Sequence, residues 1–221
     1  MDRATLEWLG ATLGHRPRDT KLYQRALTHP SHSGDNYERL EFLGDRVLGL
    51  TMAEWLIEDY PDEAEGKLST RFAALVAGNV CASVARDLGV PAHLRLGRQA
   101  QDDGVFHSDN VLGDVTEALI GALYLDAGLE PAKAFIHRIW ESRVASLAAP
   151  PKHPKAVLQE WTAANNRRPP EYKLVETSGP DHAPRFTISV SVRGKGEATG
   201  KGTTKQEAEK AAALAMLEQL Q

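Results

Sequence analysis

Three carboxylates are spaced so that one helical face would bring them together. Glu38, Glu41 and Asp45 stand at positions i, i+3 and i+7 in the segment ERLEFLGD, where several of the intervening residues are apolar. On a helix these positions fall within about 60° of one another. Because like charges on one stripe weaken a helix, such a stripe calls for a cation to neutralise it. A divalent metal ion is the simplest candidate.

A second acidic pair occurs later in the chain. Asp114 and Glu117 are three residues apart within an apolar run that extends from Val111 to Tyr124. Two helices that each present carboxylates on one face could pack so that the oxygens converge on Mg²⁺ or Mn²⁺. A site of this kind can activate water and stabilise the oxyanions that form during phosphodiester cleavage.

Two alternatives compete with this interpretation. A single acidic residue usually lies on a solvated helix face or at a helix N-terminus, although two clusters within apolar helices weaken that explanation. A di-iron bundle would instead carry Glu-x-x-His on two helices. Here the residue three positions after Glu38, and again after Asp114, is glutamate, and neither cluster contains histidine. All-oxygen ligation points away from iron and zinc.

The charge of the chain is divided unevenly along its length. Residues 1–151 carry 15 basic and 22 acidic side chains, a net charge of −7, whereas residues 152–221 carry 11 basic and 8 acidic ones, a net charge of +3. Between the two parts, three prolines lie within residues 150–154 and favour an extended linker. We therefore expect a first domain over 1–147, a linker over 148–153 and a second domain over 154–221. The acidic part could hold metal, and the basic part could hold phosphate.

The bulk composition limits the class of protein. A chain of 221 residues with 42% hydrophobic and 25% charged residues is ordinary for a globular protein. Its single cysteine, Cys81, is flanked by small and apolar residues and is expected to be a buried core thiol. The first residues lack a basic segment followed by an apolar run, and nowhere do 18 apolar residues follow one another. We expect a soluble, cytoplasmic protein that does not contact a membrane.

Hydrophobic periodicity separates a helical part from a mixed part. Helices are predicted over 4–13, 22–28, 37–59, 67–88, 108–125 and 132–147, with a polar loop over 97–104. Beyond the linker the pattern predicts a helix over 155–164, strands over 172–177, 185–192 and 197–200, and a helix over 204–220. The expected fold is an all-helical domain followed by an α-β-β-β-α domain.

Several segments together resemble ribonuclease III. They are NYERLEFLGD (36–45), ALTH (26–29), EGKLS (65–69) and DVTEALIGALYLD (114–126). The resemblance implies an endonuclease domain in which Glu41, Asp45, Asp114 and Glu117 bind the catalytic divalent metal. Within this set Asp45 and Glu117 are expected to be catalytic, and Glu117 to be indispensable for hydrolysis.

The resemblance also assigns roles to three further residues. It implies that Glu38 and Glu65 lie in the cleft and assist more peripherally, although Glu65 could simply favour a helix N-terminus. Phe42 could be a core residue. Alternatively, the family implies a homodimer in which the matching aromatic residue packs into the partner, and a two-fold dimer supplies one site for each RNA strand.

Residues from about 154 to 220 resemble a double-stranded RNA-binding domain. The matching segments are LQEW (158–161), GPDHAPRF (179–186) and GKGTTKQEAEKAA (200–212). Duplex RNA exposes 2′-hydroxyls in a shallow minor groove and phosphates beside it. The side chains expected to contact these groups are Gln159, Glu160, His182, Lys201, Lys205 and Lys210. The alternatives are that these are ordinary surface residues and that His182 is a turn residue.

Three residues depart from the family pattern. Arg46 stands where the family commonly has a small residue, and its charge could pair with a neighbouring acid. Gly113 replaces the more usual alanine and is expected to loosen its helix slightly. Gln206 replaces a lysine, so that phosphate contact is expected to weaken.

The expected function is a Mg²⁺-dependent endoribonuclease without an organic cofactor. By resemblance, it cuts both strands of duplex RNA to 5′-phosphate and 3′-hydroxyl ends with short 3′ overhangs, in ribosomal RNA precursor and mRNA processing. The alternative is a catalytically silent double-stranded RNA-binding or ribosome-associated protein. That alternative predicts lost acidic residues, but all four are present.

Overall fold

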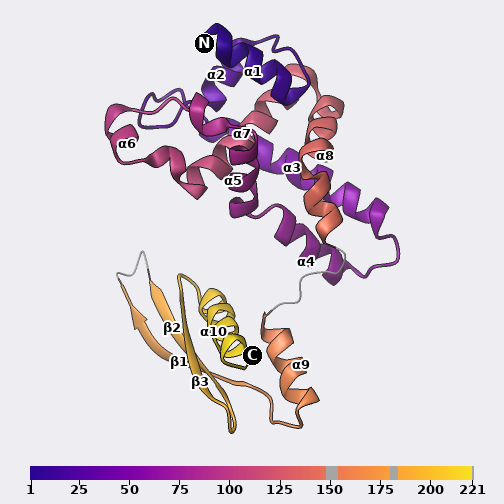
Figure 1. Ribbon diagram of the computed structural model, residues 1–221, viewed down its shortest axis with the longest axis vertical. Helices are drawn as coiled ribbons and strands as arrows, with labels where there is room; N and C mark the ends of the chain where they lie inside the picture. Colours follow the sequence, from indigo (N-terminus) through magenta and orange to yellow (C-terminus); the bar gives the residue numbers. More distant parts are fainter. Residues whose placement is uncertain (148–153, 180–183, 221) are drawn as a thin grey trace. The chain divides into compact units, whose positions relative to one another are not determined.

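The chain folds into two compact units, Met1–Pro151 and Lys152–Gln221. The computed structural model describes residues 1–147, 154–179 and 184–220 (Figure 1). The first unit is helical, and the second contains a helix, three antiparallel strands and a helix. These features confirm the predicted fold class. The linker predicted over 148–153 lies outside the described residues, as does His182.

The helices of the first unit pack around one central, buried helix. They are α1 (Arg3–Leu13), α2 (Thr20–Ala26), α3 (Glu38–Asp59), α4 (Glu65–Leu75), α5 (Gly78–Asp87), α6 (Arg98–Asp102), α7 (Asp109–Ala127) and α8 (Leu129–Ser146). Short 3₁₀ helices lie at Val90–His93 and Val105–His107. Helix α7 is buried along most of its length and packs against α3 and α5 (Figure 1). The core of the unit therefore lies around α7.

Helices α3 and α7 approach until their backbones touch. A Cβ atom built on Gly44 of α3 would lie 1.7 Å from the carbonyl oxygen of Glu117, and one built on Gly121 of α7 would lie 2.3 Å from the carbonyl oxygen of Leu40. Only glycine fits at such contacts. The two glycines thus bring the acidic stretches of the two helices within reach of each other.

The region predicted as one helix over 67–88 is two helices, so that prediction was wrong. Helix α4 ends at Leu75, Ala77 is extended with ψ of 142°, and α5 leaves at an angle of 46° to α4. The change of direction allows α5 to pack against α7. There a Cβ on Gly113 would lie 3.0 Å from the carbonyl oxygen of Gly78. Gly113, expected to loosen its helix, thus permits a close approach between helices.

Two other local predictions also differ from the structure. The expected loop over 97–104 contains α6, in which the N–H of Asp103 donates to the carbonyl of Gln99 (2.9 Å). Helix α8 begins at Leu129, before its predicted start, because Pro131 falls in the first turn, where no backbone donor is required. Among the described helices, none is by itself long and apolar enough to span a membrane, although α4 and α5 together pass the length and composition criteria as a bent pair.

The second unit packs two helices on one face of a three-stranded sheet. Its elements are α9 (Pro154–Ala164), β1 (Glu171–Ser178), β2 (Arg185–Val192), β3 (Gly196–Gly202) and α10 (Lys205–Leu220), with strand order β1-β2-β3. Val190 and Ala198 of the sheet pack with Leu158 of α9 and Met216 of α10. A Cβ on Gly200 would lie 2.1 Å from the backbone nitrogen of Ala212, so β3 and α10 are in direct contact.

Candidate active site

Carboxylates from α3 and α7 lie near one another where the two helices cross. Glu41 lies in the first turn of α3, and Asp114 and Glu117 lie on α7. Burial is the largest cause that raises the pKa of Glu117, to about 7, and the negative charges of Glu41 and Asp114 raise it further. Burial, followed by the charges of Asp114 and Glu38, raises the pKa of Glu41. The structure thus brings together Glu41, Asp114 and Glu117, with Glu38 at the margin.

The cluster has the chemistry of a hard-cation site but lacks a closed ligand set. Over the described ranges, no three His, Cys, Asp or Glu side chains are arranged to hold a metal ion as they stand. Burial raises the pKa values of Glu41 and Glu117, and neighbouring negative charges raise them further, so that the cluster favours an added positive charge. Carboxylate oxygens are the preferred ligands of Mg²⁺ and Mn²⁺. The residues present therefore fit such a cation.

Asp45 lies one helical turn beyond Glu41 on α3. Its carboxylate forms an ion pair with the adjacent Arg46, as the charge of that residue suggested. The guanidinium carbon of Arg46 also lies 4.7 Å from the centre of the Phe42 ring. Arg46 thus joins an expected metal ligand to an expected dimer contact.

Two aromatic residues beside the cluster were missed by sequence reasoning. Tyr37 is buried, and its hydroxyl donates to Oδ2 of Asp114 (3.3 Å). The ring of His29 meets that of Tyr37 edge to face, with 5.9 Å between the centres. Burial lowers the pKa of His29 below its ordinary value, and the charges of Asp114 and Glu38 offset part of this shift. Neither acidic sequence cluster contains histidine, but the fold places His29 beside both.

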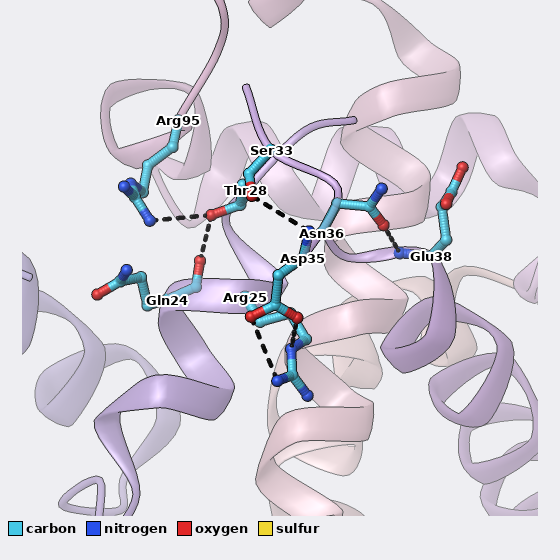
Figure 2. Close-up of polar contacts among 8 residues, drawn as sticks. All are labelled: Gln24, Arg25, Thr28, Ser33, Asp35, Asn36, Glu38 and Arg95. Carbon is cyan, nitrogen blue, oxygen red and sulfur yellow. Dashed lines mark hydrogen bonds and ion pairs between the residues drawn. The ribbon is translucent and has the colours of Figure 1, made fainter. Parts of the chain in front are cut away.

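The segment before α3 is held by polar contacts that Figure 2 shows. Arg95 donates to the hydroxyl of Thr28 (3.2 Å), and that hydroxyl donates to the carbonyl of Gln24 (2.6 Å). The side-chain oxygen of Asn36 accepts from the N–H of Glu38 (3.0 Å). These contacts fix both ends of the turn between α2 and α3, which carries His29 and Tyr37.

Cys81 of α5 lies behind Glu117. Its sulfur is 3.9 Å from Oε1 of Glu117, and the hydroxyl of Thr116 donates to the carbonyl of Cys81 (3.0 Å). Burial, followed by the charge of Glu117, raises the pKa of the thiol to about 12. Cys81 is fully buried, which confirms the prediction of a buried core thiol.

Glu65 is the first residue of α4. Its carboxylate accepts from the hydroxyl of Ser69 (2.6 Å), one turn further along the same helix. A carboxylate at this position is favourable because of the helix dipole. The placement agrees with the helix N-terminal interpretation of Glu65.

Phe42 belongs to an exposed apolar stripe on α3. Phe42, Leu50 and Ile57 are 63%, 59% and 60% exposed, and their spacing places them within about 80° of one another around the helix. The alternative that Phe42 is a core residue is therefore wrong. A stripe of three exposed large apolar side chains is typical of an interaction surface.

The predicted RNA contacts of the second unit lie on two different faces. Gln159 and Glu160 are exposed on α9, and Lys205 and Lys210 are exposed on α10. Lys201 lies between Gly200 and Gly202, whose missing side chains both face α10. Because side chains alternate along a strand, Lys201 points to the opposite face of the sheet. The structure does not bring Lys201 together with Lys205.

A capping interaction fixes the start of α10. The carboxylate of Glu207 accepts from the N–H of Thr204 (3.3 Å), and the N–H of Glu207 donates to the hydroxyl of Thr204 (3.1 Å). This reciprocal arrangement is a capping box. It sets the position of Lys205 at a helix N-terminus, where exposed N–H groups and a cation favour a phosphate.

Comparison with known proteins agrees with this architecture. Residues 19–142 match the family model described as Ribonuclease-III-like, and residues 154–220 match the double-stranded RNA binding motif. Ribonuclease 3 of Zymomonas mobilis subsp. mobilis is 56% identical over 215 residues, which cover 97% of this chain and 87% of that protein. Ribonuclease 3 of Rhodobacter capsulatus is 46% identical over 213 residues, which cover 95% and 93%.

A solved structure is also similar. The nuclease domain of ribonuclease III from Campylobacter jejuni aligns with a TM-score of 0.61 and 38% identity, over 62% of this chain and 96% of that one. A helical unit with facing acidic stretches, joined to a double-stranded RNA-binding fold, defines a nuclease that carries its own RNA-binding module. The chain belongs to the ribonuclease III family of endoribonucleases.

Proposed function

We propose that this chain is a divalent-metal-dependent endoribonuclease that cuts both strands of double-stranded RNA. The observation that carries the proposal is the meeting of Glu41, Asp114 and Glu117 across the α3–α7 contact, where burial and mutual repulsion raise the pKa of Glu117 to about 7. A bound cation would remove that repulsion. Mg²⁺ is the proposed metal, with Mn²⁺ as a substitute, because the donors are all carboxylates.

The proposed metal ligands come from both α3 and α7. Glu41 and Asp45 would hold the cation from α3, and Asp114 and Glu117 from α7. A bound divalent cation lowers the pKa of an attacking water and screens the charge on the phosphate. Glu117 must release its proton to become a ligand, and Asp45 must turn from Arg46. Glu38 and Glu65 are proposed as accessory residues of the cleft.

The second unit is proposed to present the duplex. Gln159 and Glu160 on α9 and Lys205 and Lys210 on α10 are exposed, and this exposure supports minor-groove and phosphate contacts. His182, which lies outside the described residues, is expected to contribute from the sequence between β1 and β2. Lys201 faces away from α10 and is therefore left out of the proposed binding face.

A homodimer is the proposed working form. The exposed stripe of Phe42, Leu50 and Ile57 supports it, because large apolar side chains of this kind are normally covered by a partner. The nuclease domain from Campylobacter jejuni has a region involved in dimer formation. A two-fold dimer would supply one hydrolytic site for each strand.

The dimer is tested by replacing Phe42 with aspartate. Phe42→Asp is expected to shift the protein from dimer to monomer in sedimentation velocity, because it places a charge within the apolar stripe. Leu214→Asp, at an exposed leucine of α10, should leave the dimer intact. A Phe42→Asp protein that remains dimeric would contradict the assignment of this surface.

The products and cellular role follow the family. We propose 5′-phosphate and 3′-hydroxyl ends with short 3′ overhangs, and a part in processing ribosomal RNA precursors and mRNA in the cytoplasm. The proposed reaction needs no organic cofactor, since water is the nucleophile and the carboxylates with their metal supply the chemistry.

The cleavage itself is tested with a long duplex RNA and Mg²⁺. Glu117→Gln is expected to lower the cleavage rate at least about 100-fold, because it removes a charged ligand while preserving shape. Glu141→Gln, at an exposed glutamate of α8, is the matched control and should cleave normally. If the unmodified protein binds the duplex but never cuts it, the silent RNA-binding alternative replaces the proposed enzyme.

A further inference from the structure

Tyr37 connects the two walls of the candidate metal site. It directly precedes α3, and its hydroxyl reaches across to α7, where it donates to Oδ2 of Asp114 (3.3 Å). The side chain is almost fully buried, with the residue 4% exposed. A buried hydroxyl aimed at a partly buried carboxylate restricts the orientation of that carboxylate.

The backbone of Tyr37 is fixed from both sides. Its N–H donates to the carbonyl of Thr28 (3.0 Å), and its own carbonyl accepts from the N–H groups of Leu40 (2.8 Å) and Glu41 (2.9 Å). The residue is thus tied to the end of the preceding turn and to the first turn of α3. The first turn of α3, which carries the expected ligand Glu41, therefore also fixes Tyr37. Tyr37 in turn donates to the expected ligand Asp114.

The ring of Tyr37 is held as well. His29 packs edge to face against it, and the N–H of His29 donates to the carbonyl of Arg95 (3.0 Å). Arg95 in turn donates to Thr28, in the same network that Figure 2 displays. With backbone and ring both anchored, the hydroxyl cannot follow Asp114 if that side chain rotates.

The hydrogen bond from Tyr37 makes the two carboxylate oxygens of Asp114 different. Oδ2 accepts from Tyr37, which leaves Oδ1 as the oxygen without this bond. Groups that hydrogen-bond to a metal ligand orient it, and their loss typically weakens metal binding about 10–100-fold. We propose that Tyr37 is a positioning residue that orients Asp114 to bind the divalent cation. This inference rests on the proposed function, because it requires Asp114 to be a metal ligand.

The test compares two tyrosines that each donate to a carboxylate. Tyr37→Phe removes only the hydroxyl, and Mn²⁺ binding is measured by electron paramagnetic resonance without RNA. The expected result is Mn²⁺ binding about 10-fold weaker than in the unmodified protein. Tyr23→Phe is the matched control, because Tyr23 is equally buried and donates to the remote Asp126 (3.0 Å). It should leave Mn²⁺ affinity unchanged.

A double-mutant cycle separates positioning from general loosening. In an Asp114→Asn background, Tyr37→Phe should cause little further loss of Mn²⁺ affinity, because the group it orients is no longer a carboxylate. Cleavage by Tyr37→Phe should approach the normal maximal rate once Mn²⁺ is raised to saturation. A reduced maximal rate with unchanged metal dependence would overturn the positioning role.

The outcomes distinguish this inference from the proposed function. If the unmodified protein binds Mn²⁺ and Tyr37→Phe binds it equally well, the positioning role is refuted and the proposed metal site stands. If the unmodified protein binds no Mn²⁺, both fail. An equal loss of affinity in Tyr23→Phe would also refute the inference, since the effect would then not come from Asp114.

Discussion

The contact between α3 and α7 makes a sharp prediction about a single methyl group. Gly44→Ala would place Cβ 1.7 Å from the carbonyl oxygen of Glu117, although real Cβ atoms essentially never approach another atom within 3.0 Å. The helices must then separate by about 1 Å or more, because the opposing oxygen belongs to the backbone of α7 and not to a flexible side chain. The carboxylates that face each other across this contact would move apart with the helices.

The expected cost follows from the kind of contact. Overpacking a core commonly costs about 1–3 kcal/mol, and a clash between two helix backbones belongs at or above the upper end of that range. We therefore expect Gly44→Ala to lower the free energy of unfolding by at least about 3 kcal/mol. Gly10→Ala is the matched control, because Gly10 lies within α1 and an added methyl group there would meet nothing within 4 Å. At that position alanine should stabilise the protein by about 0.5–1 kcal/mol.

Urea unfolding followed by circular dichroism measures the free energy of unfolding of both variants. Duplex cleavage at saturating Mg²⁺ tests whether the active site is intact. Gly44→Ala should lose cleavage even under conditions in which it remains folded, whereas Gly10→Ala should cleave normally. Equal stability of the two variants would refute the reasoning. A Gly44→Ala protein that is folded and fully active would refute it as well, because the close approach would then not position the carboxylates.

Two further predictions concern charge. The folded pKa of Glu117, about 7, lies above its ordinary value of 4.5, so the native state binds the extra proton and metal-free stability falls as pH rises through this window. In EDTA, the free energy of unfolding of Glu117→Gln should therefore rise relative to that of the unmodified protein between pH 5 and pH 8, by at most about 3 kcal/mol. A difference between the two proteins that does not change with pH would contradict the raised pKa of Glu117. Lys205→Gln should weaken duplex binding and reduce the slope of log affinity against log salt by about 1, whereas Lys201→Gln on the other face of the sheet should change neither. Equal effects of the two substitutions, measured by fluorescence anisotropy across salt concentrations, would refute the assigned binding face.

Local spacing predicted what depends on a single helix. The positions of Glu38, Glu41 and Asp45 indicated one helical face, and the apolar run around Asp114 indicated a buried partner helix. The spacing suggested that the two helices could pack with their carboxylates converging, and the family resemblance supported that pairing. The alternating pattern beyond the linker likewise predicted the strands and both helices of the second unit, because hydrophobic periodicity reflects local burial.

The features that sequence reasoning missed depend on contacts between distant segments. No local pattern shows that Tyr37 reaches Asp114, or that Gly44 and Gly121 let two backbones touch. The bend at Ala77 is likewise imposed by packing against α7, which overrides helix propensity. The face of Lys201 was missed for a simpler reason: the strand was predicted to end at residue 200, whereas β3 continues to Gly202. Alternation along that strand turns the lysine away from α10.

The central claim is that facing carboxylates on α3 and α7 hold the divalent cation that cuts RNA. The most direct measurement follows cleavage of a long duplex, with each strand separately labelled, by protein stripped of metal with EDTA and then supplied with Mg²⁺ or Mn²⁺. We predict that the stripped protein still binds the duplex but cuts neither strand, and that adding either metal restores cleavage of both. Cleavage that persists in EDTA would contradict the account.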